Sequence, residues 1–86
     1  MNINELIAIV KNKLEREIVT QNLKIEDKSF LHKNHKGHQE GKFHLKLIIY
    51  SEELAKISKI ASTKRIYNIL DLELKEHIHS IQILFN

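Results

Sequence analysis

The chain has 86 residues, of which 42% are hydrophobic, so it can bury the core of one small domain, and we expect residues 1–86 to form that single domain. It contains no cysteine, which excludes disulfides, thiolate catalysis and metal sites built from its own thiolates. The formal net charge of +3, with six histidines counted as neutral, suits an acidic partner or weak nucleic-acid contact but is common among globular proteins.

The first predicted element is an amphipathic helix. The stretch from Asn2 to Glu5 has the spacing of a capping box, which marks the start of a helix. Apolar residues then recur at steps of three and four: Ile3, Leu6, Ile7, Val10, Leu14 and Ile18. The opposite face is charged and is expected to be solvated rather than to bind a ligand: Lys11, Lys13, Glu15 and Arg16.

A short strand and a long connection follow this helix. In QNLKIED, Leu23 and Ile25 alternate with polar residues, which predicts a half-buried strand that ends at Asp27. Residues 28–41 hold both glycines and three histidines, with little apolar content after Leu31, so we predict a long hairpin connection.

The second half of the chain predicts a strand, a helical region and a final strand. From residue 42 the apolar pattern has period two, with one face made of Phe43, Leu45, Leu47 and Ile49 and the other of His44, Lys46, Ile48 and Tyr50. Ser51 is the expected N-cap of a helical region that runs to about Lys75, either continuous or divided into a short helix and a longer one. Its apolar repeat consists of Leu54, Ile57, Ile60, Ala61, Ile66, Ile69, Leu70 and Leu74. In IHSIQILF, alternation groups His79, Ile81, Ile83 and Phe85 on one face and Ile78, Ser80, Gln82 and Leu84 on the other.

The order of elements predicts an α+β fold. The first two strands can pair as an antiparallel hairpin, while the helical crossover to the third strand favours a parallel pairing. The expected architecture is a two-layer sandwich with the order helix-strand-strand-helix(-helix)-strand, in which helices cover one face of a small three-stranded mixed sheet.

The histidines of the connection are candidate metal ligands. The spacing of His32, His35 and His38 would allow a flexible loop to fold around zinc, copper or nickel. Structural zinc generally has four ligands, and no fourth residue stands at an established spacing, so a solvated loop is the simpler interpretation of these residues alone. A lone strand histidine such as His44 or His79 is by default half-buried with a hydrogen-bonded ring.

Other chemistry is weakly indicated. Lys59, Lys64 and Arg65 could contact phosphates, but a solvated helical face explains them equally well. No nucleophile elbow surrounds Ser29 or Ser51, so the sequence does not predict a serine hydrolase.

Taken together, the chain from about Leu23 onward resembles the BolA family. The matching positions, in order, are Asp27-Lys28-Ser29 followed by His32, then His44-Leu45, Ser51, Ile66-Tyr67, Leu70 and Ile78-His79-Ser80. Two departures are that Ser62-Thr63-Lys64 stands where the family usually has Arg-His-Arg, and that Lys56 replaces a usual glycine.

The resemblance implies a KH-like fold and a non-enzymatic adaptor role. BolA-like proteins pair with monothiol glutaredoxins and share a 2Fe-2S cluster, to which the glutaredoxin cysteine and glutathione supply thiolates. His79 matches the C-terminal histidine ligand of the family, and His32, His35 and His38 all remain candidates for the loop ligand. The implied role is in iron-sulfur assembly, trafficking or iron and redox regulation.

An alternative of a different class is a nucleic-acid-binding transcriptional regulator of the BolA type, with DNA contacts from Lys59, Lys64 and Arg65. The missing Arg-His-Arg counts against it.

The start MNINELIAIV lacks the pattern of a secretory signal, and no apolar run approaches the roughly 18 residues of a membrane span, so we expect a cytoplasmic protein without membrane contact. Because so small a domain commits its periodic apolar residues to the core, we also expect no small-molecule substrate.

Overall fold

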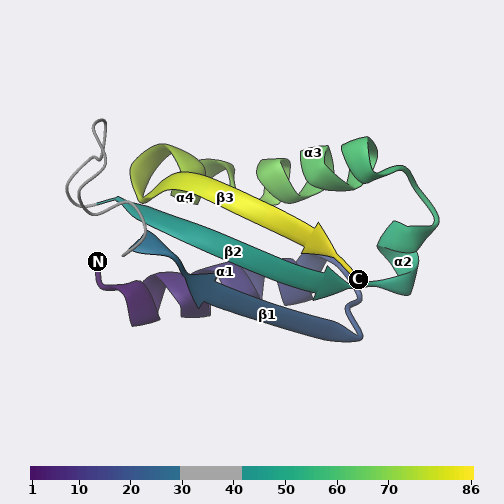
Figure 1. Cartoon of the computed structure of the whole chain (residues 1–86), viewed down its shortest axis with the longest axis horizontal. Coiled ribbons are helices and arrows are strands. Elements are labelled where there is room, and N and C mark those ends of the chain that lie inside the picture. Colours follow the sequence, from purple (N-terminus) through teal and green to yellow (C-terminus); the bar gives the residue numbers. More distant parts are fainter. Residues whose placement is uncertain (30–41) are drawn as a thin grey trace.

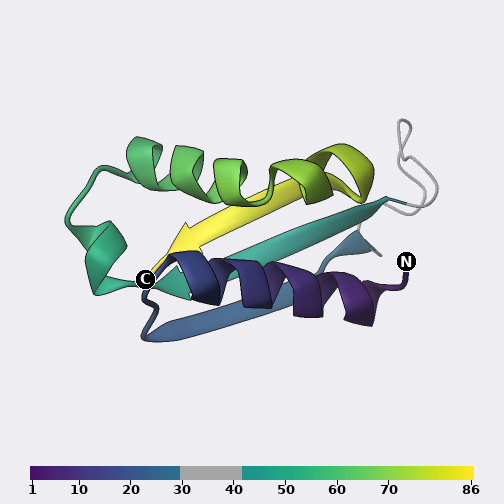
Figure 2. The ribbon, with the colours of Figure 1, turned by 180° about the vertical axis from the view of Figure 1, so that it is seen from behind.

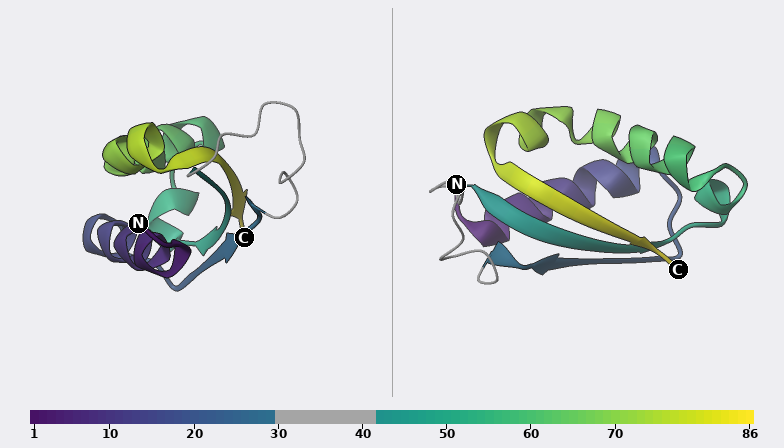
Figure 3. Two further views of the ribbon diagram at one scale, coloured as in Figure 1. Left: turned by 90° about the vertical axis from the view of Figure 1, so that its left-hand side faces the viewer. Right: turned by 45° about the horizontal axis from the view of Figure 1, so that its top comes forward.

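The computed structural model describes residues 1–29 and 42–86, in which four helices lie against one face of a three-stranded sheet (Figures 1 and 2). The end-on view in Figure 3 shows the two layers, with helices on one side and the twisted sheet on the other. The elements are α1 (Ile3–Glu17), β1 (Asn22–Asp27), β2 (Phe43–Tyr50), α2 (Glu52–Ala55), α3 (Lys59–Ile69), α4 (Asp71–Glu76) and β3 (Ile78–Phe85). The predicted two-layer α+β architecture is therefore confirmed.

The sheet has the order β1-β2-β3, with β2 in the centre. β1 pairs antiparallel with β2, from Asn22 opposite Tyr50 to Asp27 opposite Leu45. β2 pairs parallel with β3, because α2, α3 and α4 carry the chain back along the sheet before β3 begins. Both pairings agree with the sequence prediction.

The core lies between the sheet and the helices. Its buried residues come from the apolar repeats of α1, β2 and the later helices: Leu6, Val10, Leu14, Ile18, Leu45, Leu47, Ile49, Leu54, Ile66, Leu70 and Ile78. Three residues of the predicted helical repeat are exposed instead, namely Ile57 (42%), Ile60 (71%) and Ala61, while Ile69 and Leu74 are partly buried against the core. The reason is that α2 ends at Ala55 and α3 begins at Lys59, so the break changes which residues face the sheet.

The face assignment of the last strand was wrong at its first residues. Ile78, grouped by alternation with Ser80, is buried in the core, while His79, grouped with Ile81, is exposed. The cause is a register shift between β2 and β3: Phe43 pairs with Ile78, but the next residue, His44, pairs with Ser80. One extra residue on β3 breaks the two-residue alternation that the prediction assumed.

The solvated face predicted for α1 also needs one correction. Lys13 Nζ lies 2.6 Å from Glu73 Oε2 of α4, and the Glu73 side chain is only 5% exposed. The remaining oxygen, Glu73 Oε1, has no hydrogen-bond partner within residues 1–29 and 42–86. Lys13 therefore joins α1 to the short helix that leads directly into β3.

Candidate functional site

Two histidine side chains meet at the end of the sheet where β2 and β3 both begin. His44 is the second residue of β2 and His79 is the second residue of β3. Parallel strands place their amino-terminal ends at the same edge, so residues 35 positions apart in sequence become neighbours. We call these two residues the histidine pair.

The rings of the histidine pair are in direct contact. His79 Nδ1 lies 3.2 Å from His44 Nε2, and the ring centroids are 4.7 Å apart with an interplanar angle of 82°. The second nitrogen of the inner ring, His44 Nδ1, lies 2.6 Å from Ser80 Oγ. The contacts form a continuous chain from the Ser80 hydroxyl through both imidazoles.

The backbone around His44 is fixed by the turn that follows β1. The Ser29 N–H donates to Asp27 Oδ1 at 2.9 Å, which orients the serine. The His44 N–H then donates to Ser29 Oγ at 3.0 Å, and the Lys28 N–H donates to the His44 carbonyl at 2.7 Å. The Asp-x-Ser stretch noted in the sequence thus holds both backbone polar groups of His44.

The two histidines differ in their access to solvent. His44 is 4% exposed, whereas His79 is exposed. His79 contacts His44 through Nδ1, so Nε2 is the nitrogen of this exposed residue that is left for a ligand within residues 1–29 and 42–86. The buried ring of His44 therefore orients the ring of exposed His79. In metal sites, a ligating histidine is commonly oriented in this way through its other ring nitrogen.

The described part of the chain does not hold a complete metal site. Residues 1–29 and 42–86 contain no group of three or more His, Asp or Glu side chains that could bind a metal ion. Neutral imidazole is nevertheless a good ligand for iron and zinc. The exposed nitrogen of His79 suits a metal whose other ligands come from elsewhere.

The predicted ligands of the connection cannot be placed. His32, His35 and His38 all lie outside the described residues. The described residues on either side of the connection are Ser29 and Lys42. Ser29 contacts His44, and Lys42 directly precedes β2. Both residues are at the end of the sheet that carries the histidine pair.

Sequence reasoning did not place His44 and Ser80 in the site. A signal was present for His44, because it and His79 are the second residues of two strands that were expected to be parallel. Ser80 could not be found in this way, since the register shift that brings it opposite His44 leaves no trace in the residue pattern.

The basic residues predicted to contact DNA are separated by the fold. Lys59 and Lys64 line an open groove of about 520 Å³ on α3, together with Ile60, Thr63, Tyr67 and Asn68. Tyr67 is 42% exposed there. Arg65 instead donates from Nη2 to the Glu17 carbonyl at 2.9 Å and lies 3.3 Å from Glu53 Oε2, so its guanidinium is engaged within the molecule.

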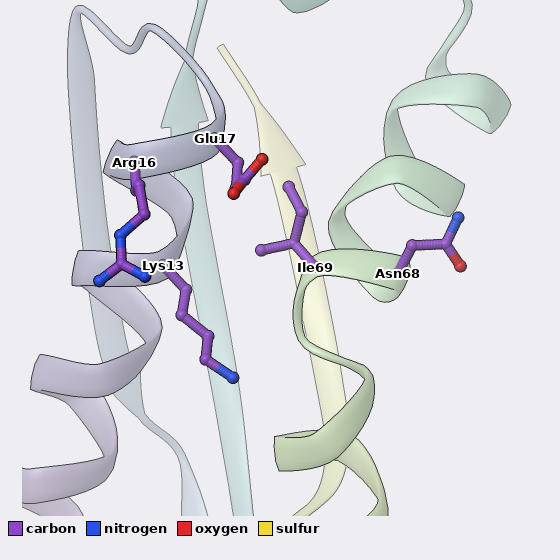
Figure 4. A pocket seen from close by; sticks show the side chains of 5 residues that line it. All are labelled: Lys13, Arg16, Glu17, Asn68 and Ile69. Carbon is purple, nitrogen blue, oxygen red and sulfur yellow. The ribbon is translucent and has the colours of Figure 1, made fainter.

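A second cavity, of about 360 Å³, lies between α1 and α3 (Figure 4). It is lined by Lys13, Arg16, Glu17, Asn68 and Ile69. Figure 4 shows the Asn68 side chain directed away from α1, and the Lys13 ammonium is paired with Glu73. The cavity therefore offers few polar groups that converge on a ligand, and we do not assign a site to it.

Among the helices of residues 1–29 and 42–86, none combines the length and the apolar content needed to cross a bilayer.

The element order, the mixed β1-β2-β3 sheet and the helices on one face define a small KH-like α+β domain. A family model described as BolA-like protein matches residues 14–85. The chain belongs to the BolA family.

Several known proteins are similar to this chain. The "DNA-binding transcriptional regulator BolA" of Haemophilus influenzae is 32% identical over 75 residues, which cover 87% of this chain and 70% of that protein. The "SufE-like protein 1, chloroplastic/mitochondrial" of Arabidopsis thaliana is 30% identical over 80 residues, but the chain spans only 22% of its length. The solved BolA domain of SufE1 from Arabidopsis thaliana has a TM-score of 0.77 at 30% identity and covers 92% of this chain and 87% of its own.

Proposed function

We propose that the protein is a non-enzymatic cytoplasmic adaptor that pairs with a monothiol glutaredoxin and uses histidines to hold a shared 2Fe-2S cluster as cargo. The observation that carries the proposal is that exposed His79 contacts the buried ring of His44 through Nδ1, which leaves Nε2 as the nitrogen that could bind iron. This position also matches the C-terminal histidine that the family resemblance implies.

The chemistry of the available ligands supports a cluster that is shared between two proteins. A chain without cysteine cannot supply the thiolates that most 2Fe-2S clusters require, but imidazole replaces thiolate on one iron in Rieske centres. The glutaredoxin cysteine and glutathione would supply the thiolates. An imidazole in place of a thiolate makes the ligand set less anionic, which raises the reduction potential of the cluster.

The second imidazole would come from the connection between Ser29 and Lys42, both of which lie at the end of the sheet that carries the histidine pair. We propose that one of His32, His35 and His38 is the second ligand.

The test is to titrate the apo-protein into cluster-loaded monothiol glutaredoxin with glutathione, while following visible circular dichroism. Wild type should change the spectrum, and His79→Ala should abolish the change. His77→Ala is the matched control, because His77 is two residues away and outside the histidine pair. A His79→Ala protein that alters the spectrum as wild type does would refute the assignment.

Single alanine variants of the loop histidines identify the second ligand. Loss of the spectral change in one of His32→Ala, His35→Ala and His38→Ala is the expected result. Three unaffected variants would exclude a loop ligand. Binding of zinc to the isolated protein, measured by calorimetry and lost in the same variants, would instead favour a His-rich loop that binds metal opportunistically.

A DNA-binding regulator is the second candidate function, favoured by the groove on α3. Lys59 and Lys64 stand beside exposed Tyr67, which suits phosphate contacts next to a surface for base stacking. Fluorescence anisotropy across salt concentrations tests it: Lys64→Ala should reduce the slope of log K against log salt by about one, while Lys11→Ala should not. Equal slopes for both variants would exclude the groove.

A further inference from the structure

The contact between the two imidazoles limits which ring nitrogens can carry protons. A hydrogen bond between His79 Nδ1 and His44 Nε2, which are 3.2 Å apart, contains one proton. A neutral imidazole carries a single N–H, so the ring that donates this proton has none on its other nitrogen. The tautomers of the two rings are consequently linked.

Two neutral arrangements satisfy the contacts described above between His79, His44 and Ser80. In the first, His79 Nδ1–H donates to His44 Nε2, His44 Nδ1–H donates to Ser80 Oγ, and His79 Nε2 keeps a free lone pair. In the second, the Ser80 hydroxyl donates to His44 Nδ1, His44 Nε2–H donates to His79 Nδ1, and His79 Nε2 carries the proton. Both rings are protonated at Nδ1 or both at Nε2.

Only the first arrangement can bind a metal through Nε2, because a protonated nitrogen has no lone pair to donate. We propose that His44 is a positioning residue for His79. His44 Nε2 accepts a hydrogen bond from His79 Nδ1–H while His44 Nδ1–H donates to Ser80 Oγ, and this leaves His79 Nε2 as the ligating atom. This inference rests on the proposed function, since it concerns how His79 is prepared for iron.

The surroundings of His44 suit such a role. His44 is 4% exposed as a residue and its backbone is held at both polar groups, so it provides a fixed point for the exposed residue His79. Ser80 can serve either arrangement, because a hydroxyl both donates and accepts. Partners of ligating histidines commonly change metal affinity by 10–100-fold when they are lost.

The decisive experiment is long-range ¹H–¹⁵N NMR of the imidazoles in the apo-protein at pH 8.5, about two units above the ordinary imidazole pKa. The spectrum reports the fraction of each ring that is protonated at Nδ1. We expect both rings to be protonated mainly at Nδ1 and to equal fractions, and we expect a smaller Nδ1 fraction for His79 in His44→Phe. Protonation of both rings at Nε2, opposite tautomers, or a His79 tautomer that His44→Phe leaves unchanged would overturn the inference.

A second measurement separates this inference from the proposed function. His44→Phe should weaken the glutaredoxin titration response about tenfold, and His44→Gln, which can still accept a hydrogen bond at the same position, should recover part of it. An undiminished response in His44→Phe would refute the positioning role. Linked tautomers in a wild-type protein that gives no cluster response would refute only the proposed function.

Discussion

The ion pair between Lys13 and Glu73 gives a quantitative prediction about how the entry to β3 is held. Nζ and Oε2 are 2.6 Å apart, and two unit charges at that distance interact by about 6 kcal/mol at an effective dielectric constant of about 20. Desolvation offsets most of this attraction, because the Glu73 side chain is only 5% exposed.

Removing the lysine leaves the carboxylate buried without its partner. Loss of one member of a fully buried pair costs about 3–5 kcal/mol. The Lys13 side chain is 32% exposed, so water can partly replace its ammonium. We therefore expect Lys13→Met to lower the free energy of unfolding by about 2 kcal/mol, which for a domain of this size lowers Tm by roughly 8–16 °C.

A double variant shows whether the ion pair itself stabilises the fold or whether Lys13 only compensates the cost of burying the Glu73 carboxylate. Replacing both groups in Lys13→Met/Glu73→Leu also removes Oε1, which has no hydrogen-bond partner in the described ranges, so stability should return to within about 1 kcal/mol of wild type. Urea denaturation followed by circular dichroism measures all variants, with Lys11→Met as the exposed control. A Lys13→Met protein as stable as Lys11→Met would refute the reasoning.

Three further predictions concern other contacts. Ser51→Ala should cost about 1–2 kcal/mol in chemical denaturation, because its buried hydroxyl both caps α2 and donates to a carbonyl, while the exposed cap variant Ser58→Ala should cost less. A hydrogen bond from Lys24, with the charges of Lys28 and Lys24, holds the pKa of Glu26 below its ordinary value. This carboxylate therefore stabilises the fold above the ordinary pKa of a glutamate, and the contribution is lost as pH falls through the lowered pKa. Glu26→Gln should therefore flatten the loss of stability in acid, and an unchanged pH profile would contradict this. Arg65→Ala should lower stability by about 1 kcal/mol while leaving the salt slope of any DNA binding unchanged.

The fold was predictable because its elements bury one face each. The period-two pattern of Phe43 to Ile49 and the helical repeat of α1 both correspond to the core of the structure. The exposure of Ile60 was not predictable, because the break between α2 and α3 depends on how both helices meet the sheet rather than on the repeat itself.

The candidate site was predictable only in part. His79 was identified through the resemblance to the BolA family, and its prediction as a ligand still awaits an experiment. Periodicity alone placed His79 on the face of Ile81, which would have turned the ring into the core. The register shift at His44 is a property of two strands together, and a single sequence contains no record of it.

Topology determines which side chains can form this site. Had β3 run antiparallel to β2, its second residue would lie beside the far end of β2, near Tyr50 rather than His44. The helical crossover instead returns the chain to the beginning of β2, and the extra residue of β3 then turns both His79 and Ser80 toward His44. The buried ring of His44 can therefore determine which nitrogen of His79 carries the proton. Neither the number of residues between the two histidines nor their neighbours in sequence predict this contact.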